Sequence, residues 1–128
     1  MIYIWLNIVP IAAATIIGFL IGLGWMKISQ RPVTPGIAMT ALLAEFWLAA
    51  ILAGALILAP TQAAPWTMAM GSAFIIWIGF VLPSMAVTLA ARGDGLAAIA
   101  SVCGYWLVAM LAQAALMQAL GLVAPPTG

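Results

Sequence analysis

The sequence predicts an all-α integral membrane protein, in which four antiparallel transmembrane helices form an up-down bundle. Hydrophobic residues make up 68% of the 128 residues and charged residues only 4%, whereas a soluble domain carries about 25% charged residues. Four long apolar runs are separated by short gaps, and each run can cross a hydrocarbon core of roughly 30 Å, which takes about 20 helical residues. The runs are continuous rather than alternating in polarity, which favours helices over a β-barrel.

The first apolar run predicts a helix over residues 2–26. Pro10 lies early in this run, where proline is tolerated if the regular helix begins there; a helix that began much earlier would bend at it. We expect the run to be a retained helix rather than a signal peptide. No basic residue precedes it, and it is longer than the apolar core of such a peptide.

The other three runs predict helices over 37–59, 66–91 and 96–122, so that residues 1–128 form a single transmembrane domain. The gap before the second helix contains lysine, arginine, prolines and glycine, which are stop and turn signals. The next gap is uncharged, and the last is the turn Arg92-Gly93-Asp94-Gly95.

The basic residues predict the orientation of the bundle. Lys27, Arg31 and Arg92 all lie in the first and third gaps, which alternate topology places on one side of the membrane. Because basic loops remain cytoplasmic, we expect both termini on the non-cytoplasmic side.

Glu45 is the one charged residue inside an apolar run. A carboxylate at that depth costs at least ~2.5–3.5 kcal/mol, so we expect it to face the bundle interior, to be neutral and to donate a hydrogen bond. It lies roughly 12 Å below the start of its helix, at about 1.5 Å per residue. Ser84 and Tyr105 fall at a similar depth, which predicts a polar layer, and Gln113 is expected to make an interhelical hydrogen bond. Either the layer relays a proton or a cation, or its hydrogen bonds only hold neighbouring helices together.

Three tryptophans, Trp47, Trp77 and Trp106, fall near the middle of helices rather than at their ends. A buried indole N–H needs a hydrogen-bond partner. These residues therefore form either an interior aromatic layer bonded to polar groups or carbonyls, or a face for a partner helix, a lipid, a quinone or another flat ligand.

Proline and small residues predict how the helices pack. Pro83 lies inside the third run and predicts a kink, either static or acting as a hinge. Gly18 with Gly22, and Ala100 with Gly104, are spaced so that a neighbouring helix can approach closely.

The composition argues against several classes of site. The chain has no histidine and a single cysteine, which excludes a disulfide, a thiolate zinc site or a histidine-ligated haem within it. We find no nucleophile–base pair and no phosphate-binding glycine loop. We therefore expect no enzyme activity and no cofactor, and the net charge of +1 gives no reason to expect nucleic acid binding.

Three segments carry a family resemblance: Gly71-Ser72-Ala73-Phe74-Ile75-Ile76-Trp77-Ile78-Gly79-Phe80-Val81-Leu82-Pro83, then Gly104-Tyr105-Trp106-Leu107-Val108, and Gly22-Leu23-Gly24-Trp25. The chain resembles a bacterial membrane family of uncharacterised role, "domain of unknown function 1761". The resemblance implies a small four-helix membrane protein, and it assigns no catalytic residue. We expect the protein to lie in the bacterial inner membrane.

Our leading hypothesis is a non-enzymatic accessory or stabilising subunit, packed against a larger membrane complex such as a respiratory or photosynthetic one. Besides the lipid bilayer, its partners would be other membrane subunits or a second copy of itself. The alternatives are a small proton-coupled transporter using Glu45, and a protein that binds a lipid or a quinone.

Overall fold

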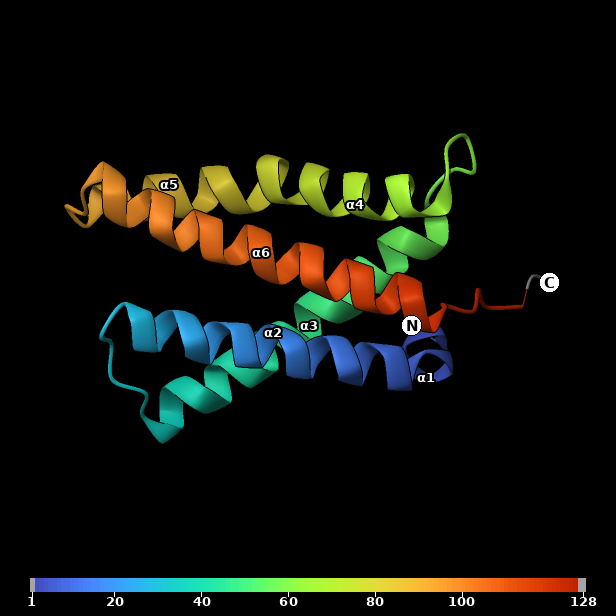
Figure 1. Ribbon diagram of the computed structural model, residues 1–128, viewed down its shortest axis with the longest axis horizontal. Helices are drawn as coiled ribbons and strands as arrows, with labels where there is room; N and C mark the ends of the chain where they lie inside the picture. The colour runs from blue at the N-terminus through green and yellow to red at the C-terminus, as the bar shows by residue number, and fades with distance from the viewer. Residues whose placement is uncertain (1, 127–128) are drawn as a thin grey trace.

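The computed structural model describes residues 2–126; Met1, Thr127 and Gly128 lie outside the described part of the domain. The described residues confirm the predicted fold class, because they are helical, without strands, and include four segments long and apolar enough to cross a membrane. The elements are α1 (Ile2–Leu6), α2 (Ile8–Ile28), α3 (Pro35–Leu58), α4 (Pro65–Ile76), the π-helical turn η1 (Trp77–Val81), α5 (Leu82–Ala91) and α6 (Leu96–Leu120) (Figure 1).

Helix α6 is the centre of the bundle. It packs against α2 on one side and against α4, η1 and α5 on the other, whereas α2 contacts none of these three. Helix α3 crosses the bundle and contacts α2, α6 and α4 but not α5. The loops 29–34 and 92–95 lie at one end, and α1 and the segment that follows α6 lie at the other (Figure 1). The three basic residues of the chain therefore share one end of the bundle.

The first predicted helix is divided, which corrects the single helix expected over 2–26. Asn7 separates α1 from α2 with φ −117° and ψ 27°. Pro10 has no N–H to donate to the carbonyl of Leu6, so the helix is weakened there. Asn7 is buried; its Nδ2 donates to the carbonyls of Tyr3 (2.9 Å) and Val123 (2.8 Å), and its Oδ1 accepts from the N–H of Val123 (2.6 Å). One side chain thus joins the two ends of the chain.

Local side-chain chemistry sets two other boundaries. Helix α3 begins at Pro35, earlier than predicted, because the Thr34 hydroxyl accepts from the N–H of Ile37 (3.2 Å) and proline suits the first helical position. Helix α6 ends at Leu120 because Gly121 has φ +86°, a conformation that glycine adopts without a Cβ clash.

Pro83 is accommodated by a wider helical turn. Proline cannot donate to the carbonyl four residues before it, and its ring crowds that carbonyl. In η1 the backbone bonds across five residues instead, so that the N–H of Leu82 reaches the carbonyl of Trp77. The Ser84 hydroxyl donates to the carbonyl of Phe80. Helices α4 and α5 continue one another in Figure 1, so the expected kink is a local widening rather than a sharp bend.

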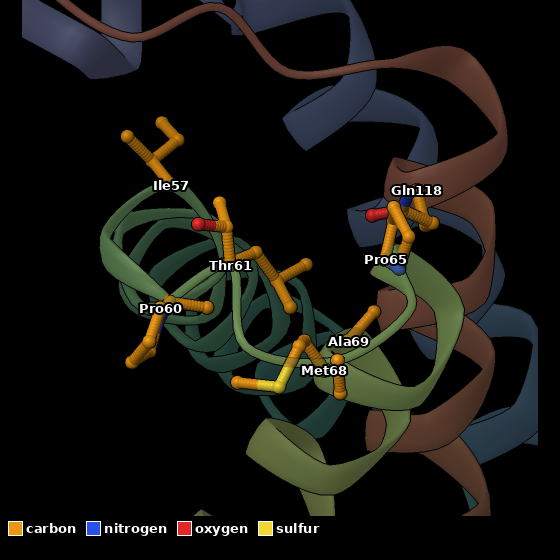
Figure 2. Close-up of a pocket in the computed structure, with 10 residues that line it drawn as sticks. Ile57, Pro60, Thr61, Pro65, Met68, Ala69 and Gln118 are labelled. Carbon is orange, nitrogen blue, oxygen red and sulfur yellow. The ribbon is translucent and has the colours of Figure 1, made fainter.

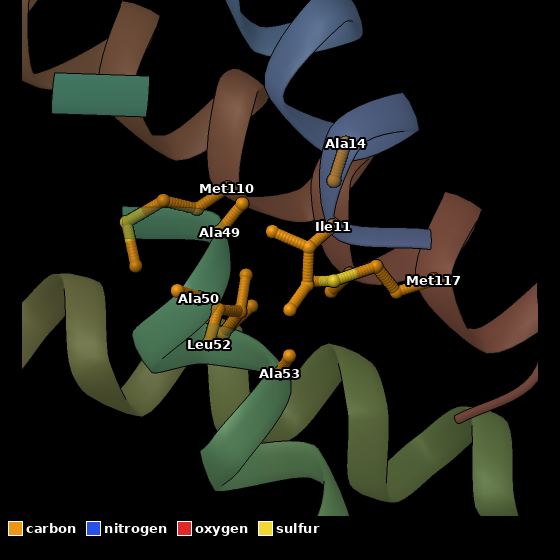
Figure 3. Close-up of a cluster of buried hydrophobic side chains, with 10 residues drawn as sticks. Ile11, Ala14, Ala49, Ala50, Leu52, Ala53, Met110 and Met117 are labelled. Carbon is orange, nitrogen blue, oxygen red and sulfur yellow. The ribbon is translucent and has the colours of Figure 1, made fainter. Parts of the chain in front are cut away.

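The core is made largely of small side chains. Its buried cluster holds six alanines, together with Ile11, Leu52, Met110 and Met117 (Figure 3). Lipid is as apolar as these side chains, so helices associate in it mainly through close van der Waals contact. Alanine permits that contact, and the two methionines fill the remaining irregular space.

We predict that Asn7→Ala lowers the free energy of unfolding by about 1–2 kcal/mol, because it removes the hydrogen bonds that join the two chain ends. Helicity followed by circular dichroism during denaturation in mixed micelles measures this change. Thr40→Ala is the control, since the exposed Thr40 hydroxyl bonds only within its own helix. Equal stability of the two variants would contradict the role given to Asn7.

Candidate functional site

Glu45 lies fully buried at the meeting point of three helices. It projects from α3 and is 0% exposed. Two side chains of α6 bond its carboxyl: the Tyr105 hydroxyl donates to Oε1 (2.7 Å), and the Gln113 Nε2 donates to Oε2 (3.0 Å). Each carboxyl oxygen therefore has a donor. The expectation that this carboxyl is neutral and donates a hydrogen bond stays a prediction, because a 2.7 Å pair with a hydroxyl suits either direction of donation.

Helix α2 contributes space and one carbonyl to this site. Gln113 Nε2 also donates to the carbonyl of Ala14 (3.2 Å). A Cβ on Gly18 would overlap both the Glu45 carboxyl and the Gln113 amide, and one on Gly22 would lie 2.9 Å from the Tyr105 hydroxyl. The predicted Gly18–Gly22 pair is thus the place where α2 approaches the polar site.

The Gln113 amide has only one favourable orientation. Its nitrogen faces the Ala14 carbonyl, the Glu45 carbonyl (3.4 Å) and the Glu45 Oε2. Turning the amide group by half a turn would place its oxygen against these three acceptor oxygens. The oxygen, Oε1, is buried and has no hydrogen-bond partner among the described residues. Gln113 therefore makes the expected interhelical bond at the cost of one unsatisfied acceptor.

Aromatic rings connect this site to the basic end of the bundle. Trp25 stacks on Tyr105, with ring centroids 5.1 Å apart and an interplanar angle of 17°. The Trp25 indole donates to the Ser101 hydroxyl (3.1 Å), and the Arg31 guanidinium lies 6.0 Å from the Trp25 ring. Trp106 packs on Tyr105 with centroids 4.8 Å apart. The sequence did not predict this series of stacked rings, because the stacking depends on which faces α2 and α6 turn toward each other.

Ser84 does not belong to the polar layer, which corrects its predicted grouping with Glu45 and Tyr105. It is exposed on α5, bonds the backbone of its own helix, and lies on a helix that does not contact α3. Residues at the same depth in the membrane can point in different directions around their helix axes, so depth alone did not place the Ser84 side chain. Gln113 occupies the place that was expected for Ser84.

The second predicted small-residue pair makes no close helix contact with any other part of residues 2–126. Ala100 is exposed, and a Cβ on Gly104 would meet no atom within 4 Å. Both residues share a face of α6 with the exposed Val108. The packing face of α6 carries Cys103, Met110 and Gln113 instead.

The three mid-helix tryptophans have different environments. The Trp77 indole donates to the carbonyl of Cys103 (2.9 Å), and its ring packs against the core. Trp47 is 54% exposed on α3. Trp106 is half-buried and lines two open cavities beside α6. Trp77 thus fits the interior account, whereas Trp47 and Trp106 lie where a partner or ligand can reach them.

A further cavity of about 410 Å³ lies at the opposite end of the bundle, under the loop between α3 and α4 (Figure 2). Its lining includes Ile57, Pro60, Thr61, Met68 and Gln118. None of the predicted site residues lines it.

Comparison with protein-family models, with curated proteins and with solved structures finds no match to this chain. The resemblance to the uncharacterised bacterial family stays a prediction. No group of three or more metal-ligating side chains lies together within residues 2–126. The arrangement that the geometry does provide is a buried carboxyl that joins α2, α3 and α6 at one depth.

We predict that Gly18→Ala lowers the free energy of unfolding by about 1–3 kcal/mol, because the added methyl displaces the Glu45 carboxyl and the Gln113 amide. Gly104→Ala makes the same change where space is open, and the higher helix propensity of alanine should leave it neutral or more stable. Denaturation in mixed micelles compares the two. A Gly18 variant as stable as the Gly104 variant would refute the close approach of α2.

A double-mutant cycle tests the Tyr105–Glu45 bond. We predict that Tyr105→Phe and Glu45→Ala, each of which removes one partner of the bond, are coupled by about 0.5–2 kcal/mol, the range of side-chain hydrogen bonds in membrane proteins. The same cycle between Tyr105→Phe and Thr40→Ala is the control. Additive effects of the first pair would show that the bond contributes nothing to stability.

Proposed function

We propose that this chain is a non-enzymatic accessory or stabilising subunit that packs through α3 against a larger membrane assembly, such as a respiratory or photosynthetic complex. The observation that carries the proposal is an unpartnered row of large apolar side chains on α3. Met39, Leu43, Trp47 and Ile51 are all exposed and follow one another at intervals of four residues. We refer to them as the α3 ridge.

The spacing of the α3 ridge suits contact with another helix. Side chains four residues apart form the ridges that fit into the grooves of a neighbouring helix. Trp47 lies near the middle of α3, whereas tryptophans that serve as membrane anchors lie at the lipid–water boundary. At mid-depth, lipid tails offer no acceptor to an exposed indole N–H, and a partner helix can supply one.

The other face of α3 holds the ridge in place. Glu45, Ala49, Leu52 and Ala53 are buried against the bundle. The Glu45 hydrogen bonds fix the rotation of α3 relative to α6, so the α3 ridge is presented on a rigid element. This supports contact with a preformed surface rather than with a mobile segment.

The buried carboxyl favours the structural role over transport. A proton-coupled carrier needs its carboxyl to meet each side of the membrane in turn. Here the carboxyl is 0% exposed and is enclosed by two donors and the α2 backbone. The bacterial inner membrane and the cytoplasmic position of the basic loops belong to this proposal.

Photo-crosslinking in native membranes tests the proposal. A photoreactive residue at position 43 or 47, on the α3 ridge, should give discrete adducts with one larger membrane protein. The same residue at position 20 of α2 or 87 of α5 is the control, because Leu20 and Val87 are equally exposed but lie off the ridge.

Trp47→Ala should then reduce recovery of the adduct partner in mild detergent, whereas Val87→Ala should not. Adducts only with lipid, or only with a second copy of this chain, would overturn the proposal of an accessory subunit.

A further inference from the structure

A small cavity bordered by charged side chains lies at the basic end of the bundle. It has a volume of about 210 Å³ and is lined by Trp25, Arg31, Leu89, Arg92, Asp94 and Val102, among others. Two of the three basic residues of the chain thus border one space, together with the only acid outside the membrane interior. We refer to this space as the basic cavity.

An apolar groove adjoins the basic cavity. The groove has a volume of about 350 Å³ and runs between the start of α3 and α6, with Ala41, Ala44, Tyr105 and Trp106 among its lining residues. Trp25 and Val102 line both spaces, so the groove continues from the charged end toward the depth of the buried carboxyl. A charged space beside an apolar one, with two side chains bordering both, matches a phospholipid with its polar headgroup and its acyl chain.

The charges in the basic cavity indicate the headgroup. Two guanidinium groups can pair with a phosphate through several N–H donors. Asp94 Oδ2 is buried and accepts no hydrogen bond from the described residues; the Arg92 Nε is 3.9 Å away. This oxygen requires a donor. A primary ammonium group supplies three N–H donors, in addition to the ion pair that Asp94 already makes with Arg92.

We propose that the basic cavity and the apolar groove bind one phospholipid with a primary amine in its headgroup, of the phosphatidylethanolamine type. Arg31 and Arg92 hold the phosphate, Asp94 accepts from the ammonium group, and an acyl chain lies in the groove over Tyr105 and Trp106. None of the α3 ridge residues lines the site, and the proposal does not rest on the proposed function.

Native mass spectrometry of the purified full-length chain tests the site with three lipids of identical acyl chains. Phosphatidylethanolamine should be retained about tenfold more strongly than phosphatidylcholine, whose methylated ammonium group keeps the charge but has no N–H donor. Phosphatidylglycerol, which has no ammonium group, should also bind more weakly. Equal retention of the three lipids would overturn the proposal.

Matched variants separate the parts of the site. The double variant Arg31→Gln and Arg92→Gln should lose binding about tenfold, while Lys27→Gln removes the third basic residue, which lines neither space, and should leave binding unchanged. Asp94→Ala, which removes the acceptor, should abolish the preference for phosphatidylethanolamine over phosphatidylcholine. A preference that survives Asp94→Ala would contradict the assigned role of that carboxylate.

The groove has its own control. Ala41→Trp should fill it and weaken binding, whereas Leu43→Trp, on the same helix but outside the groove, should not. Circular dichroism verifies that each variant is folded.

Competition with free phosphoethanolamine distinguishes a lipid headgroup from a soluble phosphate ester. Displacement at equal concentration would show a site for soluble anions and overturn the lipid proposal. Loss of lipid binding with intact crosslinking from the α3 ridge would leave the proposed function standing.

Discussion

The structure depends on one constraint, that a carboxyl at membrane depth must find its hydrogen-bond donors within the protein. Tyr105 and Gln113 provide them from α6, and the Gly18 position on α2 leaves room for both groups. Because donor and acceptor distances tolerate little variation, these bonds fix the relative height and rotation of three helices. The carboxyl is therefore best understood as the element that sets the register of the bundle.

Other polar groups within the membrane span obey the same constraint. The Tyr3 hydroxyl donates to the carbonyl of Ala50, the Thr15 hydroxyl to that of Ile11, and the Trp77 indole to that of Cys103. Each of these bonds uses a backbone carbonyl as acceptor, since lipid offers none. The alanine-rich core complements them, because small side chains bring the backbones close enough for the longer polar side chains to reach.

The core and the outer faces of the bundle have different roles. Helix α3 is held at Glu45, and its first turns border open apolar space together with the end of α2 and the flank of α6. The core thus carries the polar bonds that hold the helices, while the proposed contacts with a partner helix and with a phospholipid lie on its outer faces. Both proposed surfaces are consequences of the way α3 is anchored.

The sequence by itself determined the four crossings, the shared end of the basic loops, and the common depth of Glu45 and Tyr105. These follow from run length, charge position and the uniform rise of a helix, which are all local properties. Direction around each helix axis was decided only by the tertiary structure. Ser84 matches Glu45 in depth but points elsewhere, and the two small-residue pairs look alike in sequence although only Gly18–Gly22 faces a neighbour. Asn7 was equally hidden, because its partner Val123 lies 116 residues away along the chain and is brought to it only by folding.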